Sequence, residues 1–220
     1  MTARPRTVIL VSGGGSNLQA IIDQTRQDNL PLELAGVVSD RPGVRALERA
    51  RLAGLPALTV DFEAARSRQH FADGIADALA DLGAELVVLA GFMRILPDAL
   101  VGAFQGRMLN VHPSLLPKYP GLHTYRRALS AGDREHGSTV HFVIAELDAG
   151  PAILQYRVPI RRDDTEDTLR SRVQAGEHVI YPRAIGWVAS GRVALREGRA
   201  WLDGAPLDQP VVVDEPSPAA

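Results

Sequence analysis

Short apolar runs alternate with amphipathic stretches along the first half of the chain. The runs are almost continuously apolar, which is typical of parallel strands that a sheet buries on both faces. They cover Val8–Val11, Leu34–Ser39, Ala57–Val60, Leu86–Ala90 and Met108–Val111. Apolar residues recur at helical spacing between them, in Leu18–Arg26, Arg45–Ala53, Arg66–Leu82 and Pro97–Phe104. This order predicts right-handed βαβ units in a Rossmann-like fold, with ligands at the carboxyl ends of the strands.

The pattern changes in the second half. We expect a helix over Tyr125–Ala131, and a strand pair over Ser138–Leu147 and Ala152–Ile160 that is joined by turn-forming residues. Thr165–Ser190 predicts one long helix, with Gly176 or Pro182 as a candidate break, and Trp201–Leu207 predicts a small hairpin. The fold class is therefore α/β, a single domain over residues 1–207 with a mostly parallel twisted sheet and antiparallel strands added in its C-terminal half. Residues 208–220 are rich in proline and acidic residues, and we expect a flexible tail there.

Composition narrows the classes of function. The 220 residues are 45% hydrophobic, enough for one compact core, and the net charge of -2 comes without any long Lys/Arg block. We therefore expect small-molecule substrates and no nucleic acid as a partner, and leave a homodimer open. The absence of cysteine excludes disulfides, iron–sulfur clusters and thiol catalysis. The apolar run near the N-terminus is too short for a signal peptide or membrane span, so we expect a cytoplasmic protein with no membrane partner.

A glycine-rich segment, residues 12–17, follows the first predicted strand and opens the first predicted helix. Glycines let a backbone approach a ligand closely, and a helix N-terminus offers unpaired N–H groups to a phosphate. Ser16 or Asn17 is the expected helix cap. The segment lacks the Lys-Ser/Thr of a Walker loop and the dinucleotide spacing, which disfavours ATP and NAD. A plain strand-to-helix turn remains the alternative.

Asn110 and His112 stand at the end of the fifth predicted strand, just before a proline-rich loop. Side chains alternate along a strand, so these two point to the same face. One can donate a hydrogen bond and the other can move a proton. Asp148 lies in the turn between the two later strands, where the residues alone favour a simple turn-initiating role. Residues 91–96 could line an apolar pocket or merely pack against the next helix.

Two other kinds of site are disfavoured. Four histidines and Asp148 gather in one part of the sequence, at His112, His123, His136 and His141, but they show no metal-binding spacing, so we expect no metal. A serine hydrolase is disfavoured because no GxSxG elbow is present.

Six segments together carry a resemblance that spans about Val8 to Leu207. They are VILVSGGGSNLQAII, VVLAGFMRIL, NVHPSLLPKYPGLHTYRRAL, HGSTVHFV, ELDAGPAILQ and RVQAGEHVIYP. In order and spacing they resemble the phosphoribosylglycinamide formyltransferases of the folate-dependent formyltransferase family. The resemblance implies transfer of a formyl group from the co-substrate 10-formyltetrahydrofolate to the amine of 5-phosphoribosylglycinamide, the third step of de novo purine biosynthesis.

The resemblance also implies roles for individual residues. Asn110, His112 and Asp148 match the family's catalytic trio: the amide would stabilise the tetrahedral oxyanion, and the carboxylate would orient the imidazolium and favour its charge. The substrate-binding matches are Gly15, Ser16, Asn17, Gln174 and Glu177. The folate-binding matches are Arg68, Met93, Arg94, Ile95 and Leu96, together with Asn110. Gly14 and Tyr125 stand where many relatives have Asn and His, and Lys118 lies in the motif loop without an evident role.

Related functions are less well supported. Methionyl-tRNA formyltransferases carry an additional RNA-binding domain and a basic surface, which we do not expect here. Formyltetrahydrofolate hydrolases usually carry an extra N-terminal domain. A phosphate-binding module without activity would leave the trio unexplained.

Overall fold

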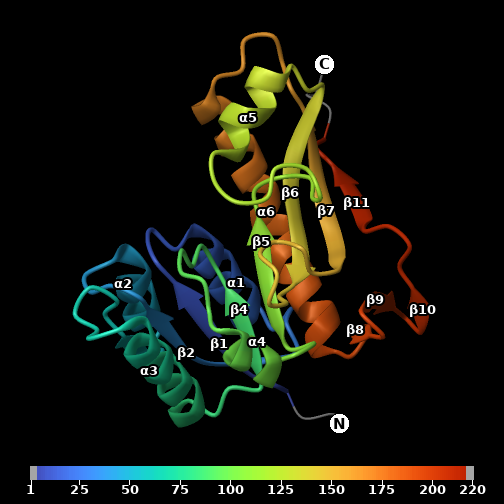
Figure 1. Ribbon diagram of the computed structural model, residues 1–220. Helices are drawn as coiled ribbons and strands as arrows, with labels where there is room; N and C mark the ends of the chain where they lie inside the picture. Colours follow the sequence, from blue (N-terminus) through green and yellow to red (C-terminus); the bar gives the residue numbers. More distant parts are fainter. Residues whose placement is uncertain (1–3, 217–220) are drawn as a thin grey trace.

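An eight-stranded mixed sheet runs through the protein, and the computed structural model describes residues 4–216 of it (Figure 1). In spatial order its strands are β11-β7-β6-β5-β4-β1-β2-β3. Their bounds are β1 Arg6–Val11, β2 Glu33–Ser39, β3 Ala57–Thr59, β4 Leu86–Leu89, β5 Met108–His112, β6 Glu135–Phe142, β7 Ala152–Pro159 and β11 Val211–Asp214. Strands β1 to β5 are parallel, whereas β6 is antiparallel to both β5 and β7. The predicted fold class is therefore confirmed.

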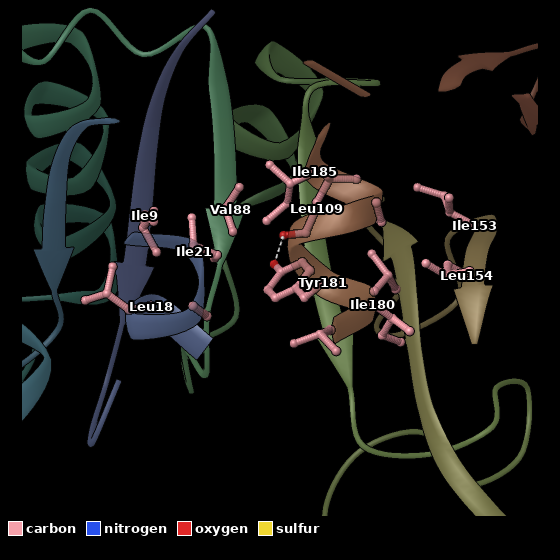
Figure 2. Packing of buried hydrophobic residues seen from close by; sticks show 14 of the residues in the cluster. Ile9, Leu18, Ile21, Val88, Leu109, Ile153, Leu154, Ile180, Tyr181 and Ile185 are labelled. Atoms are coloured by element: carbon pink, nitrogen blue, oxygen red, sulfur yellow. Dashed lines mark hydrogen bonds between the residues drawn. The ribbon is translucent and has the colours of Figure 1, made fainter. Parts of the chain in front are cut away.

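Helices cover both faces of this sheet. They are α1 Ser16–Arg26, α2 Arg45–Leu52, α3 Arg68–Asp81, α4 Asp98–Ala103, α5 Thr124–Ala131 and α6 Glu166–Ala189. The core under α1, α2 and α6 is separate from the core under α3 and α4. Helix α6 is anchored across the neighbouring parallel strands β4 and β5, because the fully buried hydroxyl of Tyr181 lies 2.9 Å from the carbonyl oxygen of Leu89 and 3.1 Å from that of Leu109 (the Leu109 contact is drawn in Figure 2).

The long helix predicted near residues 165–190 is continuous. Pro182 lies inside it without ending it, and Gly176 is buried against β7. A Cβ at Gly176 would come within 1.9 Å of the Tyr156 ring, so glycine is present here for close packing. The candidate breaks at these two residues are thus absent from the structure.

The C-terminal part differs from the prediction of a flexible tail. Val211–Asp214 forms β11, which pairs in parallel with β7, because a run of β-branched valines suits a strand. Arg172 of α6 bonds to Glu215 and Asp164, both at 2.7 Å, which fastens the end of this strand. A small antiparallel sheet precedes it, formed by β8 Val193–Arg196, β9 Arg199–Leu202 and β10 Ala205–Pro206; the predicted hairpin is its second half. Residues 217–220, also part of the predicted tail, lie outside the described residues.

Within residues 4–216, no helix has the length and apolar character needed to cross a membrane.

Candidate active site

The residues Asn110, His112 and Asp148 come together at the carboxyl end of β5. His112 Nδ1 lies 3.3 Å from Asp148 Oδ2, and both side chains are 7% exposed. The same carboxylate oxygen accepts a hydrogen bond from the N–H of Gly121 at 2.8 Å. The loop between β6 and β7 is thereby fastened to the proline-rich loop after β5, with the imidazole beside the contact.

Both ring nitrogens of His112 face oxygen acceptors. Nε2 is 2.9 Å from the carbonyl oxygen of Tyr119, and Nδ1 faces the carboxylate of Asp148. An imidazolium satisfies both acceptors, because it donates from both nitrogens, whereas a neutral ring donates from only one. The ring of His112 is therefore held between a backbone carbonyl and a carboxylate.

His141 sets the orientation of Asn110 from the neighbouring strand. The two residues are directly paired between β5 and β6, and Asn110 Nδ2 is 3.2 Å from His141 Nε2. His141 Nδ1 faces the carbonyl oxygen of Phe142 at 2.9 Å, so Nδ1 carries the proton and Nε2 accepts from the amide. Burial lowers the pKa of His141, in keeping with this neutral form. Its role is invisible in the sequence because the register between the strands is not readable there.

Asp148 has a left-handed backbone, with φ of 54°. Asp and Asn tolerate this conformation better than other non-glycine residues. The loop that carries it borders an open cavity of about 620 Å³, which Leu116, Ile144 and Arg199 also line. Asn110 and His112 do not line this cavity.

A second group of candidate residues meets where β1 passes into α1. Gln174 Nε2 donates to Ser16 Oγ at 2.9 Å, and Asn17 Nδ2 donates to Glu177 Oε2 at 2.8 Å. Residues about 160 positions apart in the sequence are thus in contact, and all four were expected to bind the same substrate. Burial raises the pKa of Glu177 to about 7, although the hydrogen bond from Asn17 opposes this. Among the described residues, the buried Oδ1 of Asn17 has no hydrogen-bond partner.

The cap of α1 differs from the prediction. Gly15, at φ 71°, is the N-cap residue, and no side chain caps the helix. Ser16 and Asn17 instead belong to the first turn and direct their side chains to α6. The N–H groups of this turn have no partner within the helix, which suits an anion.

The residues expected to bind folate follow β4, and they differ in exposure. Met93 and Ile95 are 64% and 77% exposed, whereas Leu96 is buried in the core beside α4. The Arg94 guanidinium is engaged by Asp40 at 2.7 Å and stacks on Phe62. Its loop is joined to the glycine-rich segment, because the Met93 N–H donates to Ser12 Oγ at 2.8 Å. Arg68 is exposed at the start of α3.

Two residues that the sequence left without a role have clear contacts. Lys118 pairs with Asp133 at 3.1 Å, and Asp133 also accepts from the Tyr119 hydroxyl, so the loop is fixed on its outer side. Tyr125 packs edge-on against His136, with ring centroids 5.2 Å apart. Burial raises the pKa of Tyr125 and lowers that of His136 to about 4.

The sequence matches the family described as formyl transferase over residues 5–185. It is 50% identical over 200 residues to the phosphoribosylglycinamide formyltransferase of Escherichia coli K12, across 91% of this chain and 94% of that protein. It is 42% identical over 202 residues to the enzyme of the same name from Haemophilus influenzae, across 92% and 95%. The solved phosphoribosylglycinamide formyltransferase of Coxiella burnetii has a TM-score of 0.90 and 44% identity, across 95% of this chain and 99% of that one.

Proposed function

The chain belongs to the formyl transferase family, and from that premise we propose that it transfers the formyl group of 10-formyltetrahydrofolate to the amine of 5-phosphoribosylglycinamide. The observation that carries this proposal is the pairing of His112 with Asp148 beside Asn110, at the edge of the sheet where α/β proteins bind ligands. Two relatives that match along nearly their whole length, at 50% and 42% identity, carry the name of this enzyme. The products are the N-formyl compound and tetrahydrofolate, in a step of purine biosynthesis.

The phosphoribosyl end of the substrate is proposed to bind at the start of α1. The first-turn N–H groups that follow Gly15 would bind the phosphate, with Ser16 and Asn17 beside it. Gln174 and Glu177 would reach the remainder of this half from α6. The contacts that join α1 to α6 support a shared site for these five residues.

The reacting groups are proposed to meet at Asn110 and His112. The amine nitrogen bonds to the formyl carbon and gives a tetrahedral oxyanion; then the bond from that carbon to N10 of the folate breaks. The Asn110 amide would donate to the oxyanion, a contribution worth about 3 kcal/mol in comparable sites. His112 would hold positive charge beside it, deliver its proton to N10, and take up the proton that the amine releases. Asp148 would stabilise the imidazolium throughout.

The position of Tyr119 adds a requirement. Its carbonyl oxygen occupies the hydrogen bond of His112 Nε2, the ring nitrogen that does not face Asp148. Proton delivery from Nε2 therefore requires this carbonyl to give way when the substrates bind.

The folate is proposed to lie along the loop after β4, against the exposed side chains of Met93 and Ile95 and the backbone of Arg94 and Leu96, with Arg68 available to its glutamate tail. This part rests on the family resemblance and on the exposure of the apolar side chains.

The rate of tetrahydrofolate formation, followed by absorbance with and without phosphoribosylglycinamide, tests the function. Strict dependence on the amine is expected. Loss of the formyl group without the amine would indicate a hydrolase, and no reaction under either condition would favour a binding protein.

A further inference from the structure

Arg49 lies on α2 beside the glycine-rich loop that follows β1. Its Nε donates to the carbonyl oxygen of Gly14 at 3.0 Å, and its Nη1 donates to Oε1 of Gln19 on α1 at 2.8 Å. The same helix binds the preceding carbonyl, since the N–H of Ala46 donates to the oxygen of Gly13 at 3.1 Å. Helix α2 therefore holds two successive carbonyl groups of the loop.

These carbonyls determine where the N–H groups of the loop point. In a trans peptide the C=O and N–H bonds point in opposite directions. Because the carbonyls of Gly13 and Gly14 turn toward α2, the N–H groups of Gly14 and Gly15 turn away from it. They thereby extend the set of free N–H groups at the first turn of α1, where the phosphate is proposed to bind.

The three glycines of the loop have no side chains that could maintain this orientation. Gly13 and Gly14 have open space where a side chain would stand, and glycine has the widest choice of backbone conformations. Gly15 packs directly on α2: a Cβ there would lie 2.7 Å from the Cβ of Ala46 and 3.5 Å from the Cδ of Arg49. Contacts from α2 therefore restrain the three glycines. Of the two α2 side chains involved, those of Ala46 and Arg49, only Arg49 is polar.

Arg49 also brings a positive charge to this corner of the protein. The charge acts on α6 as well as on the loop, since it adds to burial in lowering the pKa of His178. Gln174, one turn earlier on α6, donates to Ser16 at the proposed phosphate position. The guanidinium is half-buried, so solvent screens it less than a fully exposed cation.

On the basis of the function proposed above, we propose that Arg49 is a positioning residue for the substrate phosphate: it fixes the Gly14 carbonyl so that the Gly15 N–H faces the phosphate, and its charge favours the bound dianion. It touches the loop rather than the reacting atoms, so its effect belongs to substrate binding and not to the chemical step.

The test compares R49M, R49K and wild type, with R51M as the matched control. Methionine keeps an apolar stem beside Gly15 but removes the donors and the charge; lysine keeps the charge without the Nε donor. Arg51 is an exposed cation on the same helix, outside the contacts described here. Steady-state rates are measured against each substrate in turn, and again with a substrate that lacks the 5′-phosphate. Thermal melting checks that each variant is folded.

For R49M we expect the KM for phosphoribosylglycinamide to rise about tenfold, the effect of losing a charge-assisted hydrogen bond. The kcat and the KM for the formyl donor should change less than about twofold, R49K should lie between R49M and wild type, and R51M should equal wild type. Without the 5′-phosphate, R49M and wild type should have equal kcat/KM. The proposal would be overturned if R49M lost the same factor of kcat/KM with and without the 5′-phosphate, or if its KM for phosphoribosylglycinamide were unchanged.

Binding of ribose 5-phosphate, measured by calorimetry, separates this proposal from the proposed function. If wild type formylated neither phosphoribosylglycinamide nor the analogue without the 5′-phosphate, the proposed function would fail. Calorimetry would still decide the role of Arg49. Binding about tenfold weaker in R49M than in wild type would support the role. Equal binding by both proteins, or none by wild type, would reject it.

Discussion

Replacing Asp148 by asparagine isolates the effect of its charge on His112. The side chains keep nearly the same shape, and the replacement amide can still accept the N–H of Gly121, which now bonds to the carboxylate at 2.8 Å. Asparagine also tolerates the left-handed backbone at this position, where φ is 54°. D148N therefore removes the charge with little disturbance to the loop. Alanine would remove the charge and also the acceptor of the Gly121 N–H.

The distance between the two groups gives the size of the effect. Unit charges 3.3 Å apart interact by about 5 kcal/mol at an effective dielectric constant near 20. The dipole of the asparagine amide and water entering the site compensate for part of this interaction energy. We therefore expect D148N to reduce the stabilisation of the transition state by about 3 kcal/mol. This corresponds to a fall in kcat of roughly a hundredfold.

The assay is the absorbance change on tetrahydrofolate formation, with both substrates saturating. E146Q is the matched control, since it neutralises an exposed carboxylate two residues away in the same loop. We expect wild-type kcat for E146Q. A kcat for folded D148N within about threefold of wild type would refute the view that the Asp148 charge stabilises the imidazolium.

Three further predictions concern other parts of the molecule. H112A should lower turnover more than about a hundredfold while its circular dichroism spectrum stays that of wild type, because the acid–base and charge effects are both lost; wild-type turnover would exclude His112 from catalysis. Glu177 has its pKa raised from 4.5 to about 7, so the folded state binds more protons than the unfolded state in this window, and the free energy of unfolding falls as pH rises through it, by about 3 kcal/mol. Urea denaturation should show that E177Q loses this part of the pH dependence; an identical pH profile for the two proteins would contradict the burial of the charge. R172M should lower the free energy of unfolding by about 3 kcal/mol because it leaves Asp164 and Glu215 without their common partner, and R157M, which removes an exposed pair, should have a much smaller effect in the same measurement.

The sequence was most informative where one periodicity dominates a whole element. Continuous apolar runs predicted β1, β2, β4 and β5, and helical spacing predicted the helices between them, because the sheet buries those strands on both faces. The tail prediction is wrong for residues 211–214: proline and acidic residues dominate the composition of the predicted tail, whereas the three valines of β11 gain their stability by pairing with the distant strand β7. The predicted cap of α1 was wrong for a related reason, since the side chains of Ser16 and Asn17 bond to α6 rather than to their own helix.

The candidate site divides in the same way. Asn110 and His112 are visible in the sequence because they alternate on one strand. Asp148 looks like an ordinary turn residue, and only the family resemblance singled it out. The contacts of His141 and Arg49 depend on strand register and on the packing of α2 against the loop, which no local pattern records.

Formyl transfer is best tested by following a labelled formyl carbon. The protein is mixed with 10-formyltetrahydrofolate labelled at that carbon and with phosphoribosylglycinamide, and the products are analysed by mass spectrometry. Formyl transfer to this amine predicts that the label appears on the phosphoribosyl compound in step with tetrahydrofolate formation. Label recovered as free formate, with the amine unmodified, would contradict it.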